Sequence, residues 1–188
     1  ASGTVQKISY TCIDEYGANT GHANYDVMYA MAKGQTKDMN NGIVKFNFKH
    51  ILSQVVFKAK TQYDNMQVDI NMIKIHNVKM GGFFTLPATA DGTGSWSDPA
   101  DLPSEVSGLG KFTVVKDVNI TVKSNTIATD ISTTTPMLNR PQELTAWKVS
   151  ETATKSKLEA DNAKQCYLEI ACKIRQSGAY LLGSASEY

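Results

Sequence analysis

The sequence predicts an all-β protein built as an antiparallel β-sandwich. Apolar and polar residues alternate in several short runs, most clearly in residues 43–61, and turn-forming pairs such as Asn41-Gly42 separate these runs. Helical spacing of apolar residues is not sustained over a useful length. A chain of 188 residues has room for one sandwich of ordinary size, or for one domain and part of a second.

Residues 43–61 are the stretch around which the rest is organised. They hold two alternating runs, separated by a break at residues 50–54 that a helical turn or bulge would satisfy. We expect two half-buried strands whose apolar faces comprise Val44, Phe46 and Phe48 in the first and Val55, Phe57 and Ala59 in the second. Lysines on the opposite faces predict a solvated surface that discourages edge pairing; they are Lys45, Lys49, Lys58 and Lys60.

Two further strands are expected before this stretch. Residues 5–12 are expected to form a short strand whose apolar members are Val5, Ile8 and Tyr10. Residues 25–32 alternate Tyr25, Val27, Tyr29 and Met31 with Asp26, Met28, Ala30 and Ala32. Turn residues at 34–37 and 38–42 then end the second strand and lead into residue 43.

The apolar run at residues 66–75 changes phase. Met66, Val68, Ile70 and Met72 lie on one parity, whereas Ile73 and Ile75 lie on the other. This change predicts a β-bulge near residues 71–73. A short strand at residues 83–87 follows and ends at a proline.

Residues 88–110 are predicted to form a long loop rich in Gly, Ser, Asp, Thr and Pro. Trp96 is expected to pin this loop as a lid over the core, although a loop tryptophan could also stack on a sugar. Asp91, Asp98 and Asp101 could supply oxygen ligands to calcium, but their spacing does not fit an EF-hand, so solvated acids are the favoured interpretation.

The C-terminal half continues the β pattern. Strands are expected in residues 111–122, 125–131, 144–149 and 165–174, with a weaker one at 180–182 and a polar loop or hairpin tip at 150–164. Thr133 to Pro136 mark a boundary. We therefore predict an N-terminal β-sandwich domain at residues 1–135. Residues 136–188 begin a second, truncated β-domain or supply closing strands of the same sandwich.

Charge and composition exclude several function classes. The net charge is +1, and Arg140 and Arg175 are the only arginines, so nucleic-acid binding is not expected. No apolar run is long enough to cross a bilayer as a helix. The chain starts without a leader sequence and stops without a closing strand, so we expect an export signal or lipid-anchor cysteine upstream of Ala1 and further residues beyond Tyr188.

Cysteine and histidine patterns predict no metal or catalytic centre. Cys166 and Cys172 share the parity of Leu168 and Ile170, so both are expected to face the core as small apolar residues. They lie too far apart on one strand to bridge each other, and the alternative is a disulfide from Cys12 to either of them. His22, His50 and His76 have no metal-ligand spacing, and His50 is interpreted as a structural residue. No nucleophile motif is present, so no enzyme is predicted.

Several segments, in order, resemble the fimbrillin-like family of exported surface proteins from Bacteroidales, a group of anaerobic Gram-negative bacteria. The segments are 25–30 (YDVMYA), 46–58 (FNFKHILSQVVFK), 73–78 (IKIHNV) followed by two glycines and Phe83, Trp96, and Met137-Leu138 with Pro141-Gln142. Asn139-Arg140 widen the last junction relative to the common form, and the family's closing segment, a tryptophan and glycine before a tyrosine-rich strand, is absent after Tyr188.

This resemblance implies a transthyretin-like β-sandwich that serves as a fimbrial (pilus) subunit or surface adhesin without enzymatic activity. It implies export as a lipoprotein to the outer membrane, assembly with other fimbrial subunits by donor-strand pairing, and binding of a host protein or glycan. No cofactor and no nucleic acid are expected. The alternative is a surface carbohydrate-binding module of a nutrient-capture system, with Trp96, Tyr16 or Trp147 as stacking platforms.

Overall fold

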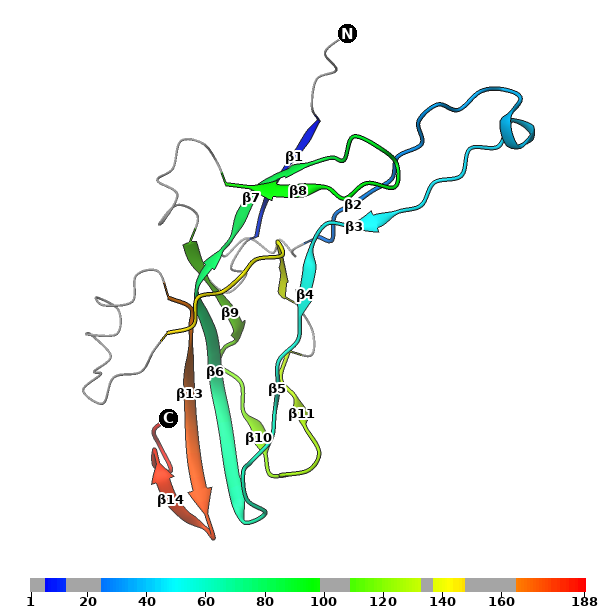
Figure 1. The fold of residues 1–188 in the computed structure, drawn as a ribbon. Helices are drawn as coiled ribbons and strands as arrows, with labels where there is room; N and C mark the ends of the chain where they lie inside the picture. Colours follow the sequence, from blue (N-terminus) through cyan, green and yellow to red (C-terminus); the bar gives the residue numbers. More distant parts are fainter. Residues whose placement is uncertain (1–5, 13–24, 99–108, 133–136, 148–164) are drawn as a thin grey trace.

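The computed structural model describes residues 6–12, 25–98, 109–132, 137–147 and 165–188, and this part of the chain is all-β, as predicted. It contains no α-helix and one short 3-10 turn, η1 (Met39–Gly42). Its strands (Figure 1) are β1 (Lys7–Thr11), β2 (Met28–Tyr29), β3 (Lys49–His50), β4 (Ser53–Val55), β5 (Lys58–Ala59), β6 (Met66–Lys79), β7 (Gly81–Thr85), β8 (Ser95–Ser97), β9 (Leu109–Val115), β10 (Ile120–Val122), β11 (Thr129–Asp130), β12 (Met137–Asn139), β13 (Tyr167–Gln176) and β14 (Ala179–Leu182).

The largest sheet is built around β6. It has five strands. Four of them run in the order β10-β6-β13-β14, and β9 pairs with the C-terminal part of β6, following β10 along that strand. All of these pairings are antiparallel. The other strands form a three-stranded sheet, β1-β7-β8, and the pairs β4–β12, β5–β11 and β2–β3.

Two bulges keep the apolar residues of β6 on one face. Met72 pairs with Ala171 and Ile70 pairs with Cys172, so Asn71 is skipped, and the bulge predicted near residues 71–73 is confirmed. A second irregularity lies at Asn77, which has a left-handed φ of 59°. Each bulge shifts the alternation by one residue. The buried residues of the strand are therefore Ile70, Ile73, Ile75 and Val78, together with Asp69 on the other face.

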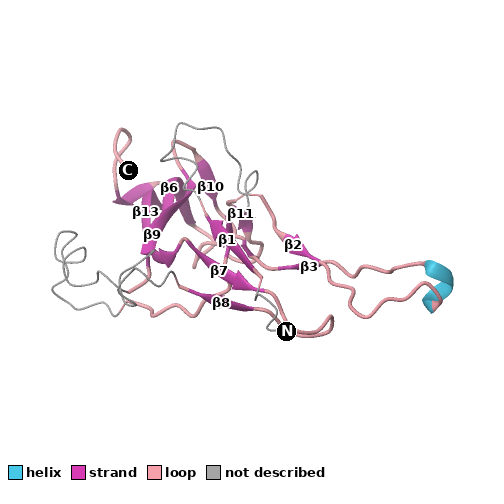
Figure 2. Ribbon diagram, turned by 90° about the horizontal axis from the view of Figure 1, so that it is seen from above, coloured by secondary structure: helices cyan, strands magenta, loops and turns pink. Residues whose placement is uncertain are grey.

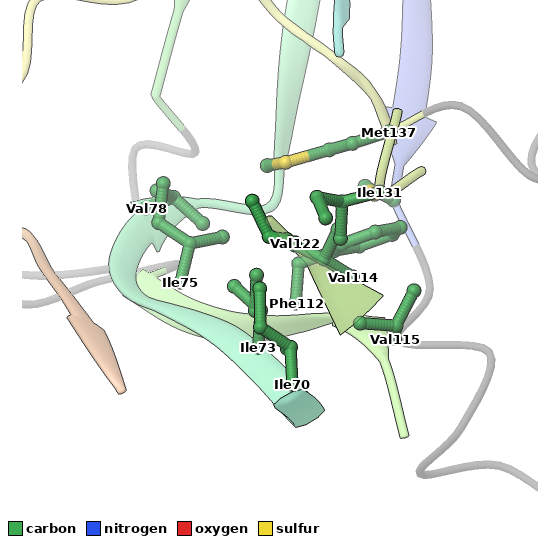
Figure 3. Close-up of a cluster of buried hydrophobic side chains, with 11 residues drawn as sticks. Ile70, Ile73, Ile75, Val78, Phe112, Val114, Val115, Val122, Ile131 and Met137 are labelled. Atoms are coloured by element: carbon green, nitrogen blue, oxygen red, sulfur yellow. The ribbon is translucent and has the colours of Figure 1, made fainter. Parts of the chain in front are cut away.

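The core lies between this sheet and a second layer. Figure 3 shows the β6 side chains packed against Phe112, Val114 and Val115 of β9 and Val122 of β10, with Ile131 and Met137 closing over them. Tyr10, Phe57 and Ala59 pack against the same cluster from the second layer. In Figure 1, β4, β5 and β11 lie on one side of β6, whereas β13 and β14 lie on the other. The sandwich prediction is confirmed.

The prediction of a half-buried strand at residues 44–48 is wrong. These residues lie in no strand, and Phe46 and Phe48 are 59% and 63% exposed. Pairing with the preceding segment is confined to Met28–Tyr29 against Lys49–His50. Beyond β2 and β3 the two chain segments run out from the body to η1 (Figure 2), and none of the described strands pairs with them there. The turn predicted at residues 38–42 is confirmed, with Asn40 and Asn41 both at positive φ.

Other predicted elements are shorter or interrupted. Residues 55–60 divide between β4 and β5, and residues 25–32 keep only β2. Residues 111–122 divide into β9 and β10 at a turn where Asp117 has a φ of 55°. Residues 125–131 keep only β11, residues 144–147 contribute one bridge from Ala146 to Cys166, and the predicted loop at 88–110 contains β8. The tract at 150–164 lies outside the described residues.

Candidate functional site: the exposed apolar face of β13

Strand β13 continues the core face of β6, but little covers it. Directly opposite residues of an antiparallel pair point to the same face. Leu168 pairs with Ile75 and Ile170 pairs with Ile73, so all four side chains belong to the core face. Ile75 and Ile73 are 8% and 5% exposed, whereas Leu168 and Ile170 are 49% and 48% exposed. Among the described residues, the second layer therefore ends over β6 and leaves β13 open.

The open surface continues along the strand and onto β14. Cys172 pairs with Ile70 and Ile174 pairs with both Val68 and Leu182, which places these residues on the same face. Leu182 is exposed. We call this surface the β13 apolar face and define it by Leu168, Ile170, Cys172, Ile174 and Leu182.

Described neighbours other than β6 pair with β13 only near its two ends: Ala146 forms a bridge with Cys166 just before the strand, and β14 pairs near its C-terminal end. On the side away from β6, β14 pairs with residues 174–176 and stops at Leu182. No strand among the described residues therefore lies beside Leu168 or Ile170 on that side. Apolar side chains beside an available sheet edge are the features that an added β-strand requires.

Cys172 belongs to this face, and Cys166 lies just before the strand that forms it. Cys166 and Cys172 are half-buried, and both pack against the core, as predicted from their parity. Burial raises the pKa of each of these thiols. Cys12 is buried, and Cys12, Cys166 and Cys172 form no disulfide, so neither of the pairings considered from the sequence is present.

The opposite face of the same strands is polar and charged. His76 Nε2 lies 2.9 Å from a carboxylate oxygen of Glu169, and the His76 ring stacks on Tyr167 with a centroid distance of 4.5 Å. Asp69 accepts hydrogen bonds from Thr121, Gln67 and Arg175. Burial alone would raise the pKa of Asp69, but these hydrogen bonds and the charge of Arg175 hold it below its usual value.

Trp96 is held inside a cluster of protein groups. Its Nε1 donates to the Ile51 carbonyl at 3.1 Å, its ring packs against Phe84 and Tyr10, and the Arg140 guanidinium lies 5.9 Å from the ring centroid. These contacts position β8 against β7 and β1. The structure thus places Trp96 among packing partners, and its use as a ligand platform stays a prediction.

Asp98 completes this cluster as an acceptor for two cations. Arg140 Nη1 and Lys79 Nζ each lie 2.7 Å from a different carboxylate oxygen of Asp98. Burial raises the pKa of Asp98, but the Lys79 hydrogen bond and the Arg140 charge outweigh this effect and keep the pKa below its usual range. Asp91 is exposed, and Asp101 lies outside the described residues.

Trp147 belongs to a different cluster. Its ring is half-buried and meets Tyr167 edge-on at 6.4 Å, and its backbone N–H donates to the Cys166 carbonyl. The structure therefore does not bring Trp96 and Trp147 into one shared site. Tyr16, the third residue considered for stacking, lies outside the described residues.

Each of the two described histidines contacts one carboxylate. His50 contacts Asp26 at the base of the β2–β3 pair, His76 contacts Glu169, and His22 lies outside the described residues. In the part of the chain that the structure describes, no three His, Cys, Asp or Glu side chains converge as metal ligands. That part of the chain also contains no helix that is long and apolar enough to cross a membrane.

Comparison with known proteins decides the family. The family model for fimbrillin-like proteins matches residues 1–184. The chain belongs to the fimbrillin-like family. No curated protein and no solved structure matches it.

Membership of the fimbrillin-like family confirms the resemblance found in the sequence. This family consists of structural surface subunits and is not known for enzymatic activity. It places the chain at the cell surface as a fimbrial subunit that assembles with other subunits. The sequence pattern had placed Leu168 and Ile170 on the core face correctly. Their exposure was missed because alternation reports which face a residue occupies, not whether a second layer covers that face.

Proposed function

We propose that this fimbrillin-like subunit accepts a β-strand from a neighbouring subunit along the β13 apolar face. The observation that carries the proposal is the contrast within one sheet between buried Ile73 and Ile75 and half-exposed Ile170 and Leu168. A donor strand beside β13 would supply backbone hydrogen bonds and place alternate apolar side chains over Leu168 and Ile170.

Strand addition would remove the apolar surface of Leu168 and Ile170 from water, and this burial is favourable. Burying a large apolar side chain fully stabilises a protein by roughly 1.5–3 kcal/mol relative to leaving it exposed. Two half-exposed side chains on one face, Leu168 and Ile170, therefore give the incoming strand both a driving force and a register. Because every subunit would carry an acceptor face, the contact can repeat from one subunit to the next.

The test is a charge placed in the acceptor face. Ile170→Lys puts an ammonium group where a donor side chain would pack, and light scattering after size-exclusion chromatography would measure assembly of the full chain. Ile127→Lys is the matched control, because Ile127 is 74% exposed in the turn between β10 and β11. We expect Ile127→Lys to assemble normally and Ile170→Lys to stay monomeric. Equal assembly of the two variants would refute the proposal.

We further propose that residues 136–188 supply closing strands of the sandwich formed by residues 1–135. The pairing of β12 with β4 and of β13 with β6 supports this arrangement. A single cooperative unfolding transition that moves with both Ile73→Ala and Met137→Ala would agree with it. Two separate transitions, each sensitive to one substitution, would favour a second domain.

The surroundings of the subunit are proposed from the family resemblance. We propose a lipid anchor on the precursor, the outer membrane of a Gram-negative anaerobe as the site of attachment, and a transthyretin-like strand arrangement. Metabolic labelling of the precursor with a fatty-acid analogue tests the anchor. Unlabelled precursor in the membrane fraction would argue against it.

Glycan binding remains the second candidate, as an adhesive property of the subunit or as the nutrient-capture module considered above. The half-buried Trp147 ring beside Tyr167 is the observation that favours it, because an accessible indole is a common sugar platform. A glycan array would compare the unmodified chain with Trp147→Ala and Trp96→Ala. A signal lost only in Trp147→Ala supports this site, and no signal from the unmodified chain rejects it.

A further inference from the structure

An extended arm leaves the body of the protein at β2 and β3. We define the arm as residues 30–48. It runs out from Tyr29, turns at η1 and returns to Lys49. In Figure 2 the arm extends to one side of the molecule, with η1 at its tip, while β13 lies towards the other side. Figure 1 shows the same separation of the arm from β13 and β14.

The returning half of the arm has the pattern of a strand without a sheet. Ile43 is in the extended region at φ −88° and ψ 121°, and residues 44–48 have no positive φ. Apolar Val44, Phe46 and Phe48 alternate with Lys45 and Asn47. All three apolar side chains are exposed, so the alternation is not used to cover the body of this chain.

A local cavity does not account for this exposure. Phe46 borders a cavity of about 800 Å³ at the base of the arm, together with Met31, Leu86 and Pro87. It nevertheless stays 59% exposed, and neither Val44 nor Phe48 lines this cavity. Alternating apolar residues on an exposed extended segment are the pattern that adds to a sheet edge in another chain.

The arm and the β13 apolar face match in both period and charge. If Val44 and Phe46 pack beside Leu168 and Ile170, Lys45 falls beside Glu169, whether the added strand is parallel or antiparallel. Glu169 lies on the charged face of β13, where it contacts His76 and lies opposite Lys74 of β6, so Lys45 would add a cation on its other side. Opposite charges side by side on neighbouring strands stabilise the pairing, so the same register satisfies both faces.

We propose that the arm of a second copy of this chain is a donor strand, with residues 43–48 added along the β13 apolar face. This inference rests on the strand-acceptor function proposed above and names the donor. The separation of the arm from β13 favours insertion between copies over insertion within one copy. Because the arm and the acceptor face are different surfaces, the contact is heterologous and repeats from copy to copy, in a ring or in an open chain.

Complementary variants test this donor directly. Phe46→Ser with Phe48→Ser removes the arm's apolar face, and Ile170→Lys blocks the acceptor face. Each variant alone should lose assembly by at least about tenfold in the concentration required, as for loss of a central apolar contact. An equimolar mixture should form heterodimers and nothing longer, because only one intact arm and one intact acceptor face remain.

The outcomes separate the donor from the acceptor. If the arm variant assembles like the unmodified chain while Ile170→Lys does not, the arm proposal is overturned and strand acceptance stands. If both variants assemble normally, both proposals fail. If neither assembles alone and the mixture gives no heterodimer, the pairing of these two surfaces is rejected. Met39→Ser, at the exposed arm tip, is the control that should assemble normally.

A peptide supplies a second measurement that does not depend on folding of the variants. A labelled peptide of residues 42–49 should bind the unmodified chain and bind Ile170→Lys at least about tenfold more weakly. The same peptide with serine at positions 46 and 48 should not bind. Equal binding of the two peptides would exclude the arm as a sequence-specific donor.

Discussion

Arg140 and Asp98 form an ion pair, with Arg140 Nη1 2.7 Å from Asp98 Oδ1, that joins the end of β12 to the end of β8. Arg140 is buried, and its Nη1 also donates to the carbonyls of Gly81 and Ser97. One guanidinium therefore fixes the β1-β7-β8 sheet against the segment that leads towards β13. The ion pair has a structural rather than a binding role.

Arg140→Ala is expected to destabilise the fold by about 2–4 kcal/mol. The substitution leaves Asp98 with Lys79 as its remaining cation and removes the contact with the Trp96 ring. Urea unfolding of the unmodified chain and the variant measures the difference. Arg175→Ala is an informative comparison, because Arg175 pairs with Asp69 on the other sheet. A loss below about 0.5 kcal/mol for Arg140→Ala would contradict the structural role.

Acid should destabilise the protein through Asp69 and Asp98. Both have a pKa held below the usual value in the folded state, so the unfolded chain binds protons first as the pH falls. The contribution of each residue is fully present above the unfolded pKa of about 3.9 and is lost as the pH falls through the folded pKa. Asp69→Asn should weaken this acid dependence, measured as the urea midpoint between neutral pH and acid. Asp91→Asn, at an exposed site, should leave the dependence unchanged.

Opposite residues of one strand pair should differ in their contribution to folding. Ile73→Ala is expected to cost about 2–4 kcal/mol, because it opens a cavity in the core. Ile170→Ala should cost less than about 1 kcal/mol in the monomer, because half of that side chain is already in water. Thermal or urea unfolding of monomeric protein measures both. Equal costs would mean that β13 is covered in solution.

Thiol chemistry should report occupancy of the β13 apolar face. Burial raises the pKa of Cys166 and Cys172, so at pH 8 both thiols should be alkylated more slowly than a free cysteine, and the rate should rise with pH. Cys172 lies on the β13 apolar face, so assembly should slow its alkylation further. Mass spectrometry of the alkylated peptides measures this change. Unchanged rates at both Cys166 and Cys172 in assembled protein would place the added strand elsewhere.

Local pattern predicted the central strand well. The phase change after Ile70 was enough to predict the bulge at Asn71, because alternation and burial impose the same constraint on both sides of it. The parity of Cys166 and Cys172 was likewise correct. In these cases the fold is fixed by the side chains of a single strand and its immediate partners.

Pattern failed where burial depends on a second layer. Phe46 and Phe48 alternate as well as Ile73 and Ile75 do, yet the first pair is exposed and the second buried. The difference lies in whether another layer packs over each segment, and residues distant in the sequence determine that. The sequence pattern also did not predict β8. This strand forms within a polar loop because Trp96 contacts Phe84, Tyr10 and Arg140, which are distant in the sequence.

Electron cryo-microscopy of the assembled subunits tests the central claim most directly. The account predicts an extra strand beside Leu168 and Ile170, contributed by a neighbouring subunit, with its alternate side chains over the β13 apolar face. An assembled form in which these two side chains remain open to solvent would contradict it.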